Sequence, residues 1–293
     1  QTSVVRFLSG SGSIWHIANG FDQIVAYGLG GGIIDTLYMN DTPGADTFDL
    51  SRMNATLSKT AQGVTVTAKG FGTVEVRQVD RTAGGSAVND DADVVKLTHS
   101  ERYPNQVFDD TLIGNPDQMT MSGPGYSNTA IGFPFVRAYS SGKGHDVAYF
   151  SDFAGPNDNR EAADTFYGRL IVSELSGPGY RLWAYLFDEV HAEARRGDDV
   201  ANLNGSPGVD QLSGTAAEVS LSGTNAQGLG FANYAKGFGT VNARGHDGED
   251  LAVLTDALVD LDTYAPPDGV ALAQLAQILW LDSFRTVERW ESA

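Results

Sequence analysis

Four residues near the middle of the chain have side chains that could cleave a polysaccharide. Arg137, Tyr139, Lys143 and His145 lie close together in sequence. A lyase needs a base such as Tyr, Lys or His to remove a proton beside a uronate carboxylate, and a cation to stabilise the charge that develops. The same residues would also serve as separate surface groups on a strand and the loop after it, and we favour this second interpretation.

The sequence lacks the residue patterns that other catalytic chemistries require. A glycosidase needs two carboxylates roughly 5 to 9.5 Å apart, and among 37 acidic residues some pair meets that condition by chance. The chain has no cysteine, and none of its five histidines has zinc-site spacing. Neither a Gly-x-Ser-x-Gly elbow nor a phosphate-binding Gly-x-x-x-x-Gly-Lys-Ser/Thr loop occurs. We therefore assign no catalytic residue, and the sequence favours a protein that is not an enzyme.

Charge and hydrophobicity narrow the possible partners. The 293 residues carry 37 acidic and 19 basic side chains, a formal net charge of −18 that would repel nucleic acid and polyanionic glycans. Hydrophobic residues make up 41% of the chain, which is enough for a substantial core. No run approaches the roughly 18 apolar residues of a membrane-spanning helix. We expect no nucleic-acid partner and no membrane insertion.

A phrase that begins with phenylalanine recurs along the chain. It has a Val or Ile three residues after the Phe and usually a small residue two positions later. Its copies begin at Phe21, Phe71, Phe133, Phe187, Phe238 and Phe284, with gaps of 50, 62, 54, 51 and 46 residues. Six copies in near-register indicate an internal repeat of roughly 50 residues.

Two further phrases keep step with the first. One is an Asp followed by alternating apolar residues, beginning at Asp35, Asp93, Asp146, Asp199 and Asp250. The other is a Leu-Ser-Gly-type turn, as in Met121–Tyr126 and Leu175–Tyr180. Alternation with a period of two, bounded by Gly, Asn, Asp or Pro, predicts short strands that end in turns. Gly269–Leu281 has partly helical spacing and is left open between helix and strand.

These repeats predict an all-β fold. We expect a right-handed parallel β-helix, or β-solenoid, of about five repeats of roughly 50 residues, with residues 1–293 as one domain. Equivalent strands would then stack about 4.8 Å apart, in coils that are either wide or narrow. A propeller fits less well because its hairpin signals do not recur. The sequence begins and ends within a repeat, so we expect it to be a segment of a longer protein.

The repeat resembles a known class of sequence. Phe-Asp-x-Val-x-Ala, Gly-Gly-x-Asp-x-Ala-x-Leu and Asp-x-x-Gly-x-Asp-x-Phe stand here as Phe21–Ala26, Gly31–Met39 and Asp41–Phe48. This signature is similar to β-solenoid repeats in large secreted proteins of environmental bacteria, and pectate-lyase-like β-helices are a neighbouring family. The resemblance implies a secreted or cell-surface location and a carbohydrate partner, and it implies no catalytic residue.

Outward positions of the predicted strands supply candidate binding residues. In the Phe phrase, positions four and six point to solvent, and the position-six column contains tyrosine, arginine, glutamate and tryptophan. Aromatic faces stack on sugar rings, and charged groups bond to sugar hydroxyls. The alternative is that these side chains are ordinary cross-strand partners. The candidate polysaccharide-binding residues are Tyr27, Tyr38, Arg77, Arg137, Tyr139, Tyr149, His191 and Arg244.

Recurring aspartates supply candidate metal ligands. Stacked carboxylates would repel one another unless backbone amides or a cation compensate. We favour amide-capped turns, with structural calcium at some of them as the alternative. The candidate calcium ligands are Asp35, Asp41, Asp46, Asp146, Asp152 and Asp199.

The sequence therefore predicts a non-catalytic extracellular module that binds a polysaccharide, most readily a neutral cell-wall glycan. The alternatives are a lyase or glycoside hydrolase of β-helix fold, and a spacer or adhesin segment. We expect a monomer, attached in a longer protein to a catalytic domain.

Overall fold

The computed structural model is built of β-strands. It describes residues 2–9, 12–19, 23–28, 36–40, 46–52, 54–59, 64–77, 93–99, 107–155, 158, 162–195, 198–215, 217–225, 227–246, 250–256, 278–282 and 286–291. These residues contain strands and turns but no helix, which confirms the all-β prediction. None of the described segments is therefore a helix able to cross a bilayer.

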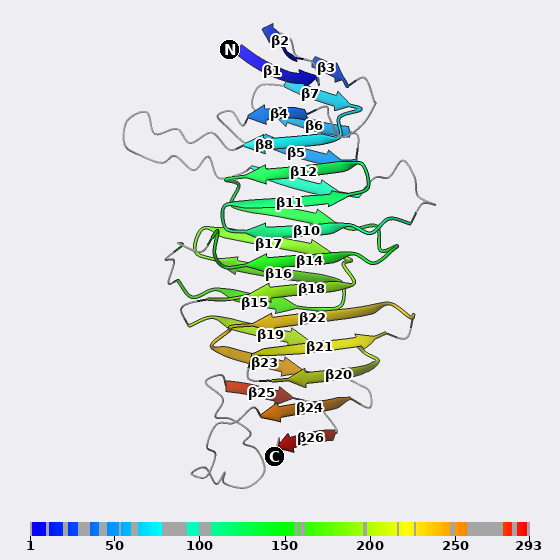
Figure 1. Ribbon diagram of the computed structural model, residues 1–293, viewed down its shortest axis with the longest axis vertical. Coiled ribbons are helices and arrows are strands. Elements are labelled where there is room, and N and C mark those ends of the chain that lie inside the picture. Colours follow the sequence, from blue (N-terminus) through cyan, green and yellow to red (C-terminus); the bar gives the residue numbers. More distant parts are fainter. Residues whose placement is uncertain are drawn as a thin grey trace. The chain divides into compact units, whose positions relative to one another are not determined.

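The strands fall into two compact units. The first unit comprises Gln1–Asp146 and Tyr180–Tyr185, and the second comprises Val147–Gly179 and Leu186–Ala293. Each unit contains two mixed sheets, which we call A1 and B1 in the first unit and A2 and B2 in the second (Figure 1).

In its described part, the first unit has seven strands in each sheet. Sheet A1 has the order β2 (Gly12–Asn19), β1 (Thr2–Ser9), β4 (Thr36–Asn40), β8 (Thr73–Arg77), β12 (Tyr126–Ile131), β11 (Gln118–Gly123), β10 (Thr111–Asn115). Sheet B1 has the order β17 (Tyr180–Tyr185), β13 (Phe135–Tyr139), β9 (Val94–Thr98), β5 (Asp46–Ser51), β6 (Asn54–Lys59), β7 (Val64–Lys69), β3 (Gln23–Tyr27).

The second unit is built in the same way. Sheet A2 has the order β14 (Val147–Ser151), β18 (Glu189–Glu193), β22 (Gly230–Lys236), β21 (Glu218–Thr224), β20 (Val209–Gly214), β24 (Leu251–Asp256), β26 (Thr286–Glu291). Sheet B2 has the order β25 (Ile278–Asp282), β23 (Thr240–Arg244), β19 (Val200–Asn204), β15 (Thr165–Gly168), β16 (Val172–Gly177). Strand β25 overlaps the end of Gly269–Leu281, the segment that the sequence left open between helix and strand.

The sheets are mixed because antiparallel groups of strands joined by hairpins alternate with single strands that pair parallel. We call the latter single crossing strands. Strands β5–β6–β7, β10–β11–β12 and β20–β21–β22 are antiparallel meanders. Single strands then pair parallel with strands that come later in the chain, as β4 does with β8 and β19 with β23. The sheets therefore do not have the uniformly parallel ladders of the predicted β-helix.

Successive copies of the Phe phrase lie in different sheets. In the first unit, Phe71 precedes β8 of sheet A1 and Phe133 precedes β13 of sheet B1. In the second unit, Phe187 precedes β18 of sheet A2 and Phe238 precedes β23 of sheet B2. The parallel neighbour of a Phe-phrase strand is an Asp-phrase strand, for example β9 beside β13. The prediction that equivalent strands stack directly on one another is therefore wrong.

The core consists of the inward side chains of each pair of sheets. Strand β13 shows the alternation, with Val136 and Ala138 buried and the side chains between them partly exposed. The four signature phenylalanines that the structure describes, Phe71, Phe133, Phe187 and Phe238, are buried as well, and the Phe133 ring meets Phe48 edge-on at 5.2 Å between centroids. The predicted inward and outward positions are confirmed for strands β8, β13, β18 and β23, whereas in β3 Ile24 is only half-buried.

The Leu-Ser-Gly phrase forms a hairpin turn where it is best preserved. Gly123 pairs with Tyr126 at the end of the β11–β12 hairpin, with Pro124 and Gly125 between them. Gly125 has a φ of 79°, as a type II turn requires at its third position. Gly123 is needed for another reason: a Cβ there would lie 2.3 Å from Oδ1 of Asp110.

Candidate functional site

Among the residues that the structure describes, four pairs of buried aspartates recur near the ends of the strands. In each pair, the first aspartate stands near the start of a hairpin-linked group of strands and the second directly precedes a single crossing strand. The backbone N–H of the first donates to Oδ1 of the second over 2.7, 2.7, 2.8 and 3.0 Å in Asp46–Asp93, Asp110–Asp146, Asp164–Asp199 and Asp210–Asp250. All eight residues are buried. The second member of each pair therefore accepts a backbone N–H, as predicted, but the donor lies 35 to 47 residues away in the chain and not in a local turn as expected.

The sequence did not reveal the pairing itself. A signal is present: Asp46-Thr47-Phe48, Asp110-Thr111-Leu112 and Asp164-Thr165-Phe166 repeat an Asp-Thr-apolar phrase. The two members of a pair are 35 to 47 residues apart, because loops of unequal length lie between them. Because this separation varies, the sequence does not show which aspartates pair.

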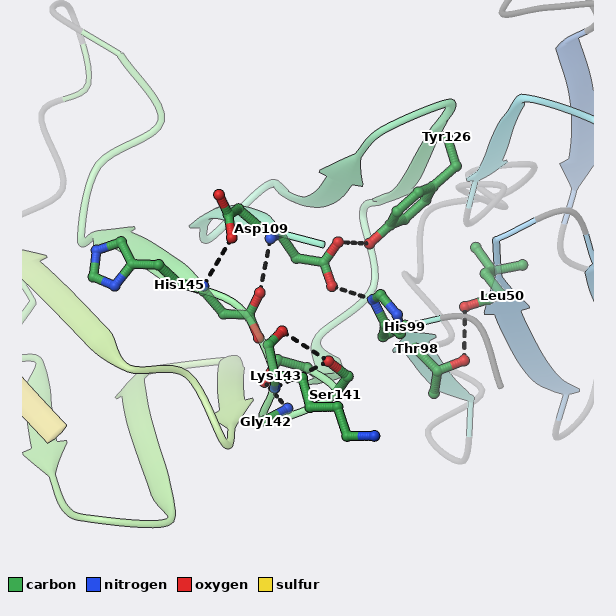
Figure 2. A network of polar contacts seen from close by, with 12 residues as sticks. Leu50, Thr98, His99, Asp109, Tyr126, Ser141, Gly142, Lys143 and His145 are labelled. Carbon is green, nitrogen blue, oxygen red and sulfur yellow. Dashed lines mark hydrogen bonds and ion pairs between the residues drawn. The ribbon is translucent and has the colours of Figure 1, made fainter. Parts of the chain in front are cut away.

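The Asp110 carboxylate is held by two side chains as well as by its place in a pair. His99 Nδ1 lies 2.5 Å from Oδ2 of Asp110, and Tyr126 Oη donates to Oδ1 over 2.8 Å (Figure 2). Burial, together with the neighbouring Asp110 charge, holds the pKa of the Tyr126 phenol above its ordinary range. His99 and Tyr126 thus satisfy both carboxylate oxygens in the core.

The Asp210 carboxylate is satisfied by a different set of donors. Ser206 donates its backbone N–H to Oδ2 over 2.6 Å and its hydroxyl to Oδ1 over 2.9 Å. The His246 backbone N–H donates to Oδ2 of the paired Asp250 over 3.2 Å. Burial raises the pKa of Asp210, and the Ser206 hydrogen bonds oppose that rise.

The remaining pair in the second unit has a third carboxylate beside it. Asp152 follows strand β14, and Asp152, Asp164 and Asp199 each place a ligand atom within 4.8 Å of the others. The three side chains are 4%, 4% and 1% exposed, so the charges are removed from water. We call these residues the acidic cluster. Burial, with smaller contributions from the Asp152 and Asp198 charges, raises the pKa of Asp199 to about 6, while the Asp164 amide opposes the rise.

Replacing Asp199 with Asn should therefore have an effect that depends on pH. Because the folded-state pKa is above the unfolded value near 4, ionising Asp199 costs folding free energy as pH rises from about 4 to about 6. The Asn side chain keeps an acceptor for the Asp164 N–H and carries no charge. With chelator present, the melting temperature of Asp199→Asn relative to the unmodified chain should rise across this range and then level off. A constant difference from pH 4 to pH 8 would contradict this prediction.

A second group of side chains covers the outer surface of strands β13 and β17 in the first unit. The β13–β17 face consists of Phe135, Arg137, Tyr139, Arg181, Trp183 and Tyr185, which are opposite one another in register. The Tyr139 and Tyr185 rings stack at 4.4 Å with 13° between their planes. The Arg137 and Arg181 guanidinium carbons lie 5.0 and 5.7 Å from the centre of the Trp183 ring. Arg137 and Tyr139 were predicted as binding residues, whereas the β17 residues were not, because β17 carries no copy of the Phe or Asp phrase.

A narrower aromatic row crosses sheet A2 of the second unit. Tyr149, His191 and Tyr234 are register partners on β14, β18 and β22. The His191 ring stacks on Tyr149 at 5.1 Å and on Tyr234 at 4.1 Å. Tyr149 and His191 were predicted as binding residues, and the structure places them side by side.

The other predicted binding residues are distributed over several strands. Tyr27 is 68% exposed on β3, Tyr38 is half-buried on β4, and Arg77 and Arg244 are exposed on β8 and β23. Arg77 contacts Glu75 on its own strand. Because successive Phe phrases change sheet, the single outward line expected from the position-six column is not formed by the described strands of either unit.

The predicted metal ligands have separate locations. Asp46 and Asp146 belong to aspartate pairs, and Asp152 and Asp199 belong to the acidic cluster. Asp35 and Asp41 lie outside the described residues.

The four residues considered for lyase chemistry occupy a strand and the turn after it. Arg137 and Tyr139 point outward on β13, while Lys143 and His145 lie in the exposed turn that precedes Asp146. The His145 backbone N–H donates to Oδ1 of Asp109 over 2.9 Å, and its side chain points away from His99 and Tyr126 (Figure 2). This arrangement agrees with the interpretation of separate surface residues.

Comparisons of the chain with family models, with curated proteins and with solved structures give no match.

Proposed function

We propose that this chain is a secreted, non-catalytic β-solenoid module that binds a neutral polysaccharide through the β13–β17 face. The observation that carries the proposal is the arrangement of six aromatic and arginine side chains on two adjacent strands of one sheet. Crossovers between parallel strands of one sheet are almost always right-handed, so a right-handed winding is part of the proposal.

The chemistry of this face suits a chain of sugar rings. Phe135 is 40% exposed, and beside it the Tyr139–Tyr185 stack and Trp183 offer rigid apolar area with polar edges. Arg137 and Arg181 present several N–H donors for hydroxyl oxygens. Because stacking already fixes these side chains, little conformational entropy remains to be lost when a ligand binds.

The overall charge favours a neutral ligand. A net charge of −18 produces a field that opposes approach of a polyuronate, even toward a face that carries two arginines. A neutral cell-wall glycan meets no such barrier.

Affinity electrophoresis in gels that contain soluble glucans, xylans or mannans tests this proposal. At least one neutral polymer should retard the full chain, and Tyr139→Ala combined with Trp183→Ala should weaken binding about tenfold or more, as loss of aromatic anchors does. Tyr167→Ala is a matched control, because Tyr167 is a partly exposed tyrosine of sheet B2 with Arg169 over its ring. Its retardation should be unchanged.

Three outcomes would contradict the proposal. They are no retardation in any neutral polymer, equal loss in the control variant, and retardation by pectin or alginate alone. Incubation with the same polymers should release neither reducing ends nor unsaturated products, and their release would favour the lyase or hydrolase alternative.

A further inference from the structure

The acidic cluster is an unusual feature of the second unit. Three carboxylates, from Asp152, Asp164 and Asp199, are at most 4% exposed and bring one ligand atom each within 4.8 Å of the others. Like charges this close in a core destabilise one another, because the interior screens them much less than water does. The fold therefore needs protons or a cation at this point.

One oxygen in the cluster has no hydrogen-bond donor. Oδ1 of Asp199 accepts the Asp164 N–H over 2.8 Å, whereas Oδ2 is buried and accepts no hydrogen bond from the described residues. Asp199 is only 1% exposed, so bulk water does not serve this oxygen. Buried carboxylate oxygens are normally satisfied, and one left open beside two further carboxylates is a ligand position for a metal ion.

Comparison with the neighbouring repeats shows what Asp152 replaces. His99, Asp152 and Gly205 each follow a single crossing strand, and the N–H of each donates to the last residue of the adjacent Phe-phrase strand, over 3.0, 3.2 and 2.8 Å. They are therefore equivalent positions. At the Asp110–Asp146 pair this position is His99, whose imidazole bonds to the Asp110 carboxylate. At the Asp210–Asp250 pair it is Gly205, and the next residue, Ser206, donates to Asp210. Only the Asp164–Asp199 pair of these three repeats has a carboxylate there.

Arg195 binds Asp152 through its backbone and directs its guanidinium to other groups. The Arg195 backbone N–H donates to Oδ2 of Asp152 over 3.0 Å, while its guanidinium lies 3.8 Å from the centre of the Phe153 ring and donates to the Gly155 carbonyl. These contacts fix the loop that carries Asp152. They thereby keep the Asp152 carboxylate in its place in the acidic cluster.

We propose that Asp152, Asp164 and Asp199 bind one calcium ion in the second unit. Carboxylate oxygens suit hard divalent cations, and calcium–oxygen distances of about 2.3 to 2.6 Å allow ligand atoms up to about 5 Å apart. Magnesium requires about 2.0 to 2.1 Å and strict octahedral geometry, so it fits this spacing less well. The ion would neutralise two of the three charges and give Oδ2 of Asp199 a partner. This site is separate from the β13–β17 face, and either proposal can fail without the other.

Calorimetric titration of the chelator-treated full chain with calcium chloride tests the site. Asp199→Asn and Asp152→His should each lose one bound calcium per chain, the second because it restores the imidazole found at the Asp110–Asp146 pair. The matched control is Asp250→Asn, since Asp250 caps Asp210 in the same way and has Gly205 in place of the third carboxylate. It should keep the full stoichiometry.

Thermal unfolding gives an independent readout. Calcium should raise the melting temperature of the unmodified chain and of Asp250→Asn by several degrees over chelator at equal ionic strength, because it binds only the folded state. Magnesium should give a smaller shift, and Asp199→Asn should show none from this site. Absence of calcium binding, or an unchanged calcium stoichiometry in both Asp199→Asn and Asp152→His, would overturn the proposal.

Discussion

Replacing His99 with Ala should lower the free energy of unfolding by about 2 to 4 kcal/mol, because it leaves a buried carboxylate oxygen without its hydrogen-bond partner and removes a buried side chain. The Asp110 side chain is fully buried, and its Oδ2 depends on the His99 ring at 2.5 Å. Alanine would leave that oxygen without its partner and would also leave a cavity beside it. Urea unfolding at neutral pH, followed by circular dichroism, measures the loss.

His145→Ala is the control for this prediction. His145 lies in an exposed turn, and its backbone N–H donates to Oδ1 of Asp109, a hydrogen bond that the substitution keeps. The change should stay within about 0.5 kcal/mol. If His99→Ala cost no more than His145→Ala, Asp110 would not depend on the imidazole.

A double-mutant cycle distinguishes a shared carboxylate from two independent contacts. Tyr126→Phe removes the hydroxyl that donates to Oδ1 of Asp110, and Phe231 already occupies the corresponding place at the end of the β21–β22 hairpin. Because His99 and Tyr126 bond to the same carboxylate, their effects should not be additive. Additive losses would indicate that each residue acts through its own packing.

The sequence predicted local features of the fold well. Alternation in Phe135–Tyr139 assigned the inward and outward side chains correctly, because the period of a strand depends only on its own residues. The hairpin at Gly123–Tyr126 followed from Pro and Gly at fixed turn positions. Asp146 and Asp199 accept backbone N–H groups, as predicted, but from Asp110 and Asp164, which lie 36 and 35 residues away, and not within local turns as expected.

The neighbours of each strand were harder to predict. A repeated phrase suggests that like strands stack on like, yet β9 of the Asp phrase lies beside β13 of the Phe phrase. Backbone hydrogen bonds form equally well with either neighbour. The neighbour of each strand therefore depends on how the loops and meanders pack. The same limit hid the β13–β17 face, since Trp183 and Tyr185 become neighbours of Arg137 and Tyr139 only through pairing between strands.

The acidic cluster shows what sequence can and cannot supply. Asp152 and Asp199 were already candidate calcium ligands, because recurring carboxylates repel one another unless a cation or backbone amides compensate their charge. Their closeness to Asp164 depends on a register set by loops of unequal length. Asp152, His99 and Gly205 are recognised as equivalent positions only from the backbone hydrogen bonds of the structure.

Replacing Gly237 with Ala should cost about 3 kcal/mol of stability, because two penalties coincide at this residue. Gly237 directly precedes the buried Phe238 and has a φ of 77°, which an alanine adopts at a cost. A Cβ there would also lie 2.1 Å from the Ala194 carbonyl oxygen, an atom of the backbone that cannot simply rotate away. The Ala194 N–H donates to the Lys236 carbonyl over 2.8 Å, so relief of the clash would strain that bond.

Gly228→Ala separates the two penalties. Gly228 has a φ of 78°, almost the same as Gly237, but a Cβ there would meet nothing within 4 Å. Its substitution should therefore cost only the backbone term, about 1 to 2 kcal/mol. Urea unfolding of both variants gives the difference directly. Equal losses would show that the chain near Ala194 yields easily, whereas a larger loss at Gly237 would indicate that this residue must be glycine because the Ala194 carbonyl lies too close for a side chain.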